Sequence, residues 1–413
     1  MAHSSDTRPS DNRPLPPLRD TVTVVFFMIW VQLIGSMASL WLPAIAPEVA
    51  ASLGVDASLI GIQVVVVYLG GMVTSLLAGG LVARLGAWRV SQVSLGLFAL
   101  AHLVIASGVL SLMVLGSFII GFGYGLINPP AAHLMSKVVT PKNRNLVFSI
   151  RFTGVPLGGI AASTFAPALA LSLDWRTSML VTICAALFMA LIMEFFRKRW
   201  DSDRSRTAPL LRSPLADIKA AWKLPAIRWL CFTGLFLAAI QLSLNAFAVT
   251  FLVEETGYTL VAAGLALTAV QVAGVIGRIA WGVLADYIRS GFAALIVNAA
   301  LTGVSALATV FIAPDWPVGL VYALFFVFGF TAMGWNGVFA SAVVQHSPEG
   351  KAGNMTGAAL FFTFSGVIVG PAIFTIGYQL FGTYSGSFMV TAILAIAGAG
   401  MIALSARGAR ASL

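Results

Sequence analysis

RKRWDSDRSRTAPLLRSPLADIKAAWK, residues 197–223, is the one long polar interruption in an otherwise apolar chain of 413 residues. Six apolar runs precede it and six follow it, each about as long as the roughly 20 residues that a helix needs to cross a bilayer. The runs span residues 22–47, 58–82, 88–108, 110–135, 145–171, 176–196, 226–251, 260–285, 291–312, 318–344, 354–381 and 386–406. This pattern predicts an all-α membrane protein with about 12 transmembrane helices in two six-helix halves.

The composition excludes most soluble classes of protein. Charged residues make up 9% of the chain and hydrophobic residues 59%, whereas a soluble domain is about 25% charged. A transmembrane β-barrel is also excluded, because its strands are about 10 residues of alternating polarity. Cys184 and Cys231 fall in predicted helices, so we expect no disulfide. The sequence contains no phosphate-binding loop, no metal-ligand spacing and no nucleophile–base pair, so we expect no enzyme, no cofactor and no metal site.

The distribution of charge predicts the orientation in the membrane. When the loops are placed alternately, the Lys and Arg residues gather on the side of the middle loop, and the other side has Arg176 alone. This positive-inside pattern predicts a bacterial inner-membrane protein with both termini in the cytoplasm. The formal net charge of +9 then reflects topology and contact with anionic lipid headgroups. We expect no nucleic-acid partner, and we expect a monomer in the lipid bilayer.

The middle loop divides the chain into predicted segments. These are a disordered, Pro-rich cytoplasmic tail (1–20), an N-terminal six-helix bundle (21–197), a basic cytoplasmic linker (198–225), a C-terminal six-helix bundle (226–406) and a short cytoplasmic tail (407–413). The two halves match one another at similar offsets and in a common order, which predicts a duplicated, pseudo-symmetric unit. The matches are LGVDASLIG (53–61) with TGYTLVAAG (256–264), GGLVARLG (79–86) with GVLADYIR (282–289), GFGYGLIN (121–128) with GFTAMGWN (329–336), and GVPLG (154–158) with GVIVG (366–370).

Two arginines lie inside predicted membrane helices. Arg278 comes eight residues before Asp286, which places it roughly 12 Å inside the membrane. Arg151 lies a similar distance into the run 145–171, which enters from the same side. Inserting an arginine at a helix centre costs at least about 2.5–3.5 kcal/mol, and no acid falls in the middle of a predicted helix. We therefore expect a substrate anion to pair with these arginines; capping of backbone carbonyls and snorkelling toward the cytoplasm are the structural alternatives.

Other polar residues accompany the arginines. Helical spacing places Arg278 on one face with Gln271, Gly274 and Gly282, and Arg151 on one face with Gly154 and Gly158. Small residues there leave room either for a ligand or for a closely packed helix. His133 is a candidate proton carrier, with a packing role as the alternative. The further candidates for substrate binding, which could also bond helices together, are Gln32, Tyr124, Asn128, Gln241, Asn245, Trp335 and Asn336.

Over nearly its whole length the sequence resembles the major facilitator superfamily, whose loop signature is G-x-L-x-D-R-x-G-R-R. The first copy of this loop keeps most of the signature, but Ala83 replaces its acid, whereas the second copy keeps Asp286 and has Tyr287 in place of the arginine. In that superfamily these loops latch the two halves in one access state. The resemblance implies two bundles that rock around a central site near the midplane. It assigns to the gating latch Gly79, Arg84, Gly86, Arg89, Gly282 and Asp286.

The helix with Arg278 has a more specific resemblance. Arg278-x-x-x-Gly282-x-x-Ala285-Asp286 is similar to the helix-eight pattern of monocarboxylate and oxalate transporters, in which the arginine binds the substrate carboxylate. The aspartate that monocarboxylate transporters have one turn earlier is Gly274 here. SIRFTGVPLGG, residues 149–159, resembles a segment of cyanate and nitroimidazole-type transporters that has a basic residue at this place. The resemblance is thus to anion-transporting branches in general.

These features predict a secondary active transporter that moves a small organic anion, a mono- or dicarboxylate, by alternating access. Arg278 and Arg151 would hold the carboxylate, because the planar guanidinium matches its bidentate geometry. Coupling by proton symport and by exchange with a counter-anion both stay open. One alternative is a multidrug or amphipathic-compound exporter of the same superfamily. The alternative from another class is a membrane receptor or scaffold that transports nothing.

Overall fold

The computed structural model describes residues 17–55, 58–205, 207–209 and 214–411. Within these ranges every regular element is a helix, and 12 spans are long and apolar enough to cross a membrane. The predicted all-α membrane fold is confirmed. Residues 1–16 of the predicted N-terminal tail and residues 412–413 of the C-terminal tail lie outside the described residues.

The helices follow the order predicted from the apolar runs. The N-terminal half contains α1 (Leu18–Ala44), α2 (Ala46–Leu53), α3 (Ser58–Leu85), α4 (Ala87–Ile105), α5 (Leu110–Gly125), α6 (Asn128–Val138), α7 (Arg144–Phe152), α8 (Gly154–Ser172), α9 (Trp175–Ser178), α10 (Leu180–Glu194) and α11 (Arg197–Trp200). The linker contributes α12 (Pro214–Lys223). The C-terminal half contains α13 (Pro225–Glu254), α14 (Leu260–Tyr287), α15 (Gly291–Thr309), α16 (Val318–Ala332), α17 (Asn336–Gln345), α18 (Ala352–Phe381) and α19 (Tyr384–Ala411).

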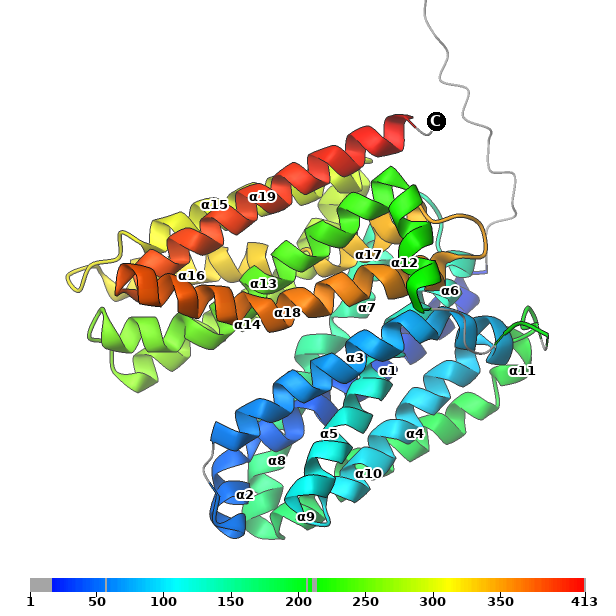
Figure 1. The fold of residues 1–413 in the computed structure, drawn as a ribbon, viewed down its shortest axis with the longest axis horizontal. Coiled ribbons are helices and arrows are strands. Elements are labelled where there is room, and N and C mark those ends of the chain that lie inside the picture. The colour runs from blue at the N-terminus through cyan, green and yellow to red at the C-terminus, as the bar shows by residue number, and fades with distance from the viewer. Residues whose placement is uncertain (1–16, 56–57, 206, 210–213, 412–413) are drawn as a thin grey trace, which may run out of the picture.

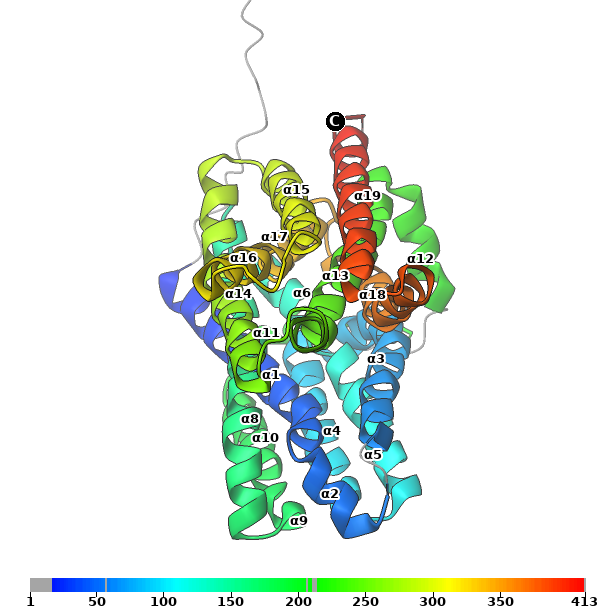
Figure 2. The ribbon, with the colours of Figure 1, turned by 90° about the vertical axis from the view of Figure 1, so that its left-hand side faces the viewer.

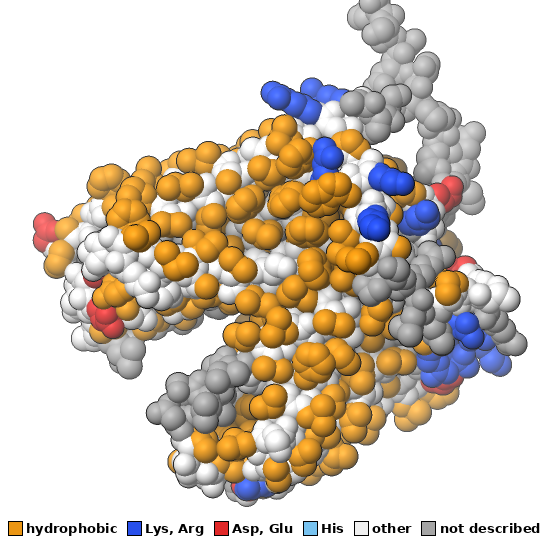
Figure 3. Space-filling model, in the orientation of Figure 1, with side chains coloured by type: hydrophobic (Ala, Val, Ile, Leu, Met, Phe, Trp, Pro, Cys, Tyr) orange, Lys and Arg blue, Asp and Glu red, His pale blue; other side chains and the backbone are white. Residues whose placement is uncertain are grey.

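Each half has its own hydrophobic core and forms one bundle. Apart from Ala340, one core consists of side chains between Val24 and Trp200, and the other of side chains between Ala221 and Ile402. The two bundles are separate groups of helices in both ribbon views (Figures 1 and 2). The outer surface is largely apolar (Figure 3), with exposed side chains such as Phe188, Leu191 and Ile396. A continuous apolar surface of this kind fits contact with lipid.

The bundles touch at one end and diverge at the other. They contact one another through α3 with α18, α6 with α18, and α7 with α14 and α17. Figure 3 shows a V-shaped cleft between the bundles that opens at the opposite end. We call these the closed end and the open end. Most of the Lys and Arg side chains visible in Figure 3 lie at the closed end.

Glycines allow the close approach of the bundles at the closed end. A Cβ atom at Gly337 of α17 would lie 2.3 Å from Ser149 Cα of α7, and one at Gly357 of α18 would lie 2.2 Å from the Ser75 carbonyl oxygen of α3. Neither position has space for a side chain. The backbones of opposite bundles are therefore in direct contact at this end.

Two spans of the N-terminal half are broken near the middle of the membrane. α5 ends at Gly125, and α6 begins at Asn128 with prolines at its first positions, where no backbone donor is needed. α7 ends at Phe152 and α8 begins at Gly154, because the ring of Pro156 excludes a helical carbonyl four residues earlier. The runs 110–135 and 145–171, which the sequence predicts as single helices, are therefore pairs of helices.

The C-terminal half has a corresponding break in the run 318–344. α16 ends at Ala332 and α17 begins at Asn336, with Gly334 between them. These breaks place Asn128, Arg151 and Asn336 at helix ends inside the protein. Interrupted helices at membrane depth are tolerated where they line a cavity or a binding site. The breaks therefore mark the region in which a site is expected.

Candidate functional site

The two buried arginines converge where α7 crosses α14. A Cβ atom at Gly282 of α14 would lie 2.6 Å from Ser149 Oγ of α7, so the helices are in close contact there. Arg278 precedes Gly282 by one turn, and Arg151 follows Ser149 on α7. Tyr124 of α5 lies near both guanidinium groups. Opposite bundles thus direct one cation each toward a shared region.

Neither arginine is paired with a carboxylate of the residues that the structure describes. Arg151 is 1% exposed and Arg278 is 3% exposed. Arg151 Nη1 donates a hydrogen bond to Asn128 Oδ1, but Arg151 Nε, Arg151 Nη2 and Arg278 Nε are buried without hydrogen-bond partners. No Asp or Glu in the described ranges forms an ion pair with either residue. Burying an unpaired ion costs several kcal/mol even after relaxation, so the chemistry of this donor set fits an anion.

Polar and aromatic side chains of the N-terminal bundle surround Arg151. Gln32 Nε2 of α1 donates to Ser36 Oγ at 3.2 Å, while Gln32 Oε1 is buried without a partner. The Tyr124 hydroxyl faces both of these residues. The Tyr124 ring packs against Tyr68 of α3 and Phe364 of α18, with centroids 6.0 and 6.1 Å away. Phe364 belongs to the other bundle, so this aromatic cluster joins the two halves beside the arginines.

The C-terminal bundle contributes a cluster of amides. Gln241 Oε1 of α13 accepts hydrogen bonds from Trp335 Nε1 at 3.0 Å and from Asn336 Nδ2 at 3.1 Å. The break between α16 and α17 places both donors there. Asn245 Oδ1 accepts from Gln271 Nε2 at 3.2 Å, and this pair is exposed. Gln271 is seven residues before Arg278 on α14, so it lies about 10 Å nearer the open end.

The glycines on the arginine-bearing faces serve packing. A Cβ at Gly274 would lie 2.9 Å from Met333, and one at Gly154 would lie 2.7 Å from the Ile29 carbonyl oxygen. Gly158 meets α1 in the same way, with the Leu33 carbonyl oxygen 2.3 Å from its Cβ position. Of the two roles that the sequence left open for these small residues, the structure shows close packing of neighbouring helices. A cavity at the bundle interface is lined by Arg151, Asn128 and Asn336 instead.

Comparison with known proteins places the chain in a family. Residues 25–371 match the Major Facilitator Superfamily. This chain belongs to the major facilitator superfamily. The resemblance predicted from its loop signatures is therefore confirmed, and the members similar to it that are described next are transporters, which are not enzymes.

Two transporters of the superfamily are similar to this chain over most of its length. The hexuronate transporter of Bacillus subtilis (strain 168) is 23% identical over 403 residues, covering 92% of this chain and 93% of the relative. The 3-(3-hydroxy-phenyl)propionate transporter of Escherichia coli (strain K12) is 27% identical over 308 residues, covering 73% of this chain and 74% of the relative. The crystal structure of the transporter FucP in the outward conformation has 17% identity and a TM-score of 0.76, and the match covers 94% of this chain and 99% of FucP. This structural similarity confirms the fold.

Asp286, which the sequence assigns to the gating latch, bonds across the two bundles at the closed end. Asp286 Oδ1 of α14 accepts hydrogen bonds from the backbone nitrogen of Asn145 at 3.1 Å and from Asn145 Nδ2 at 2.8 Å. Asp286 Oδ2 accepts from the Leu146 nitrogen at 2.8 Å. These donors form the first turn of α7 in the opposite bundle, where a carboxylate also interacts favourably with the helix dipole. Asp286 therefore joins the bundles through three hydrogen bonds.

We expect Asp286→Ala to loosen the closed end. Charge-assisted hydrogen bonds are worth about 1.5–3 kcal/mol each, so the closed-end contact should open more often. The reporter is Ala340→Cys, a buried position of α17 at the bundle interface, in a C184S/C231A background. Its labelling by a thiol reagent should accelerate about tenfold or more. Asp315→Ala, an exposed acid at the open end, is the matched control; equal labelling in both variants would contradict this role of Asp286.

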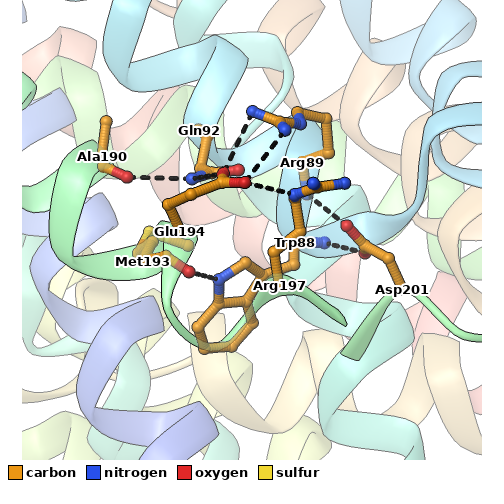
Figure 4. Close-up of polar contacts among 8 residues, drawn as sticks. All are labelled: Trp88, Arg89, Gln92, Ala190, Met193, Glu194, Arg197 and Asp201. Atoms are coloured by element: carbon orange, nitrogen blue, oxygen red, sulfur yellow. Dashed lines mark hydrogen bonds and ion pairs between the residues drawn. The ribbon is translucent and has the colours of Figure 1, made fainter. Parts of the chain in front are cut away.

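The basic residues of the other latch copy bond within their own half and its linker. Arg84 Nη1 donates to the Ala208 carbonyl oxygen at 3.0 Å, and Arg89 Nη1 lies 3.3 Å from Glu194 Oε2. Figure 4 shows how Glu194 also accepts from Gln92 and Arg197. In the described ranges, neither arginine forms a hydrogen bond or an ion pair with the C-terminal bundle. Arg84 therefore holds the linker against the N-terminal bundle and Arg89 joins α4 to α10, which the sequence did not predict.

An acid of the linker caps the first turn of α4. Asp201 Oδ1 accepts from the Trp88 nitrogen at 2.8 Å, and Asp201 Oδ2 accepts from the Arg89 nitrogen at 3.1 Å (Figure 4). Gly86 has φ of 94°, and a Cβ there would lie 2.2 Å from the Asp201 carboxyl carbon. Burial raises the pKa of Asp201 above its ordinary value, although both backbone donors oppose the shift. Glycine at position 86 is therefore required both by its conformation and by its contact with Asp201.

The structure places His133 away from the arginines. His133 Nε2 lies 2.8 Å from Asp203 Oδ2, and Lys137 Nζ lies 2.7 Å from the same oxygen. Burial raises the pKa of Asp203, but the hydrogen bonds from Lys137 and His133 outweigh this effect and hold it below its ordinary value. His133 is thus bonded to the linker at the closed end, whereas Asn128, on the same helix, bonds to Arg151.

Several site residues were missed by the sequence analysis. Tyr68 and Phe364 lie in uniformly apolar runs, so only the packing of α3 against α18 reveals them. Asp217 of α12 is 7% exposed and accepts a hydrogen bond from Asn354 Nδ2 at 2.8 Å. Asn354 in turn covers Gly79, whose Cβ position is 2.3 Å from Asn354 Nδ2. Asp217 lies in the polar linker, so no apolar periodicity or helix pattern points to this contact.

Proposed function

We propose that this protein is a secondary active transporter of small organic anions, with mono- and dicarboxylates as its substrates. The observation that carries the proposal is the pair of buried arginines that no carboxylate of the described chain neutralises. Two of its relatives are transporters of a hexuronate and of 3-(3-hydroxy-phenyl)propionate. These compounds share a carboxylate and differ in the rest of the molecule, which supports a carboxylate as the group held by the arginines.

The arginines would bind the substrate in a transporter that works by alternating access. Arg151 is supplied by one bundle and Arg278 by the other, so an anion bound between them draws the two halves together. Two guanidinium groups can each form bidentate hydrogen bonds with a carboxylate. The rest of the substrate would be surrounded by polar and aromatic side chains of both bundles: Tyr124, Asn128, Gln32, Gln241, Asn336 and Trp335. Its entry from the open end would be lined by Asn245 and Gln271.

We also propose the orientation. The gathering of Lys and Arg at the closed end follows the positive-inside rule, so this end would face the cytoplasm of an inner membrane. The structure then corresponds to an outward-open state, with the site reached from outside. Proton symport and exchange against a second anion are both compatible with this arrangement, since the arginine pair specifies the bound group and not the coupling.

The test is uptake into proteoliposomes across a panel of mono- and dicarboxylates. Carboxylates should exchange across the membrane, while cationic amphipathic compounds should not. Imposed pH gradients separate the two modes of coupling, because a symporter accumulates substrate when the outside is acidic and a strict exchanger requires internal anion. Transport of cationic drugs without transport of any carboxylate would contradict the proposal and favour an exporter.

A further inference from the structure

One side of the linker helix α12 is exposed and combines apolar with basic side chains. Helical spacing places four exposed residues on this side: Leu215, Lys219, Trp222 and Lys223. The exposed fraction is 59% for Leu215 and 43% for Trp222. In the described part of the chain neither lysine has an ion-pair partner. We call these four residues the outer face of α12.

The opposite side of α12 is bound to the protein and fixes the direction of the outer face. Asp217 Oδ2 accepts a hydrogen bond from Asn354 Nδ2 of α18 at 2.8 Å, and Ala221 is 1% exposed. α12 packs on α3, α13 and α18, and it crosses the closed-end part of α18 (Figure 1). Asp217 is the one acid among residues 214–223. Because it is turned inward, the outer face keeps both of its positive charges.

The outer face lies at the level of the membrane-spanning helices. The Trp222 ring stacks on Phe362 of α18 with centroids 6.3 Å apart, and it makes an edge contact with Phe232 of α13 at 5.6 Å. Phe362 comes ten residues after the start of α18, so it lies roughly 15 Å along that span from its closed-end terminus. α12 therefore lies beside the spans and not beyond their ends. Exposed tryptophan and leucine side chains at this level contact lipid.

We propose that the outer face of α12 binds anionic phospholipids of the surrounding bilayer. Leu215 and Trp222 would enter the boundary between headgroups and acyl chains. The apolar stems of the two lysines would lie along this boundary, so that each ammonium group reaches a lipid phosphate. Lysine combined with tryptophan and leucine is typical of helices that lie in this boundary. The contact depends neither on the substrate nor on the side of the membrane that the closed end faces.

The charge of the outer face decides which lipid it prefers. A zwitterionic lipid such as phosphatidylcholine carries a cationic group next to its phosphate, whereas phosphatidylglycerol does not. One lysine near a membrane surface favours anionic lipid by about fivefold, so Lys219 and Lys223 together should enrich it by about 25-fold. An acidic soluble protein would meet the same two charges, but it could not cover Trp222 at the depth of Phe362.

The experiment measures how lipids with a nitroxide near the top of the acyl chain quench a bimane label on Leu215→Cys, in the full-length C184S/C231A protein. The bilayers contain phosphatidylcholine and phosphatidylglycerol, and one lipid or the other carries the nitroxide at equal mole fraction. Labelled phosphatidylglycerol should quench at least about twofold more strongly than labelled phosphatidylcholine. Equal quenching by the two would overturn the proposal. Weak quenching by both, with strong quenching by iodide, would also overturn it, because the outer face would then contact water.

Charge variants and a second label position provide the controls. K219Q/K223Q removes both charges and should be quenched equally by the two lipids, whereas K219R/K223R keeps both charges and should keep the preference. Leu380→Cys is the matched label position, because Leu380 is 76% exposed at the open end of α18; the two lipids should quench it equally. A preference that survives in K219Q/K223Q, or that is as large at Leu380→Cys, would overturn the assignment of anionic lipid to the outer face.

Discussion

Arg278→Met is expected to abolish carboxylate binding while leaving the unliganded protein at least as heat-stable as the parent. Removing one member of a buried charge pair costs about 2–5 kcal/mol, or a fall in affinity of about 30- to 5,000-fold. Without substrate, the substitution should not lower the free energy of unfolding, because methionine removes a buried cation whose Nε has no partner. Binding should be followed by ligand-induced thermal stabilisation, and stability by the thermal midpoint without ligand.

Measuring both ligand-induced stabilisation and the thermal midpoint without ligand distinguishes an arginine that binds substrate from one that stabilises the fold. If Arg278 caps carbonyls or bonds helices together, Arg278→Met will lower the thermal midpoint of the unliganded protein. Arg278→Lys keeps the charge and loses the planar fork, so it should bind carboxylates more weakly than the parent but better than Arg278→Met. Arg176→Met, at an exposed arginine near the open end, is the matched control and should behave like the parent.

The second large effect is expected from a disulfide across the closed end. A Cβ atom at Gly353 of α18 would lie 4.0 Å from the His133 Cβ of α6, within the range of about 3.5–4.5 Å that a disulfide requires. H133C/G353C in the C184S/C231A background should therefore cross-link under oxidation. Transport should fall to the level of protein-free liposomes and return on reduction, while substrate binding from the open end persists.

The single variants provide the controls for this cross-link. H133C and G353C alone should respond little to oxidant, and H133C alone also tests the proposed proton carrier, because loss of pH-driven accumulation with intact counterflow would assign that role to His133. Full transport by the cross-linked protein would contradict alternating access, since α6 and α18 belong to opposite bundles and have to separate when the closed end opens.

The sequence predicts the number and order of the spans because burial in lipid leaves only one way to satisfy the backbone. The apolar runs and the basic linker can be identified in the sequence without any knowledge of how the helices pack. The helix breaks were missed, although Pro129 and Pro156 are visible, because a proline at membrane depth can either kink a span or end one helix and begin another. Tertiary contacts decide between these outcomes, and here they place Asn128 beside Arg151.

The sequence predicts the two arginines of the candidate site but not the arrangement that brings them together. An arginine inside a membrane span is costly enough to stand out in any sequence, so Arg151 and Arg278 could be found directly. Their meeting depends on the crossing of α7 and α14, which no periodicity encodes. Tyr68, Phe364 and Thr356 are ordinary residues of apolar helices, and only the arrangement of the two bundles shows that they lie at the interface.

The central claim is that the arginine pair recognises a negative charge, and the most direct measurement compares a carboxylate with its neutral isostere. A carboxylate that the proteoliposome assay shows to be transported and the corresponding amide have nearly the same shape and differ in charge. We expect the carboxylate to stabilise the parent protein thermally and the amide to have no effect, and we expect neither to stabilise Arg278→Met. Equal stabilisation by the two compounds, or stabilisation of Arg278→Met by the carboxylate, would contradict the account.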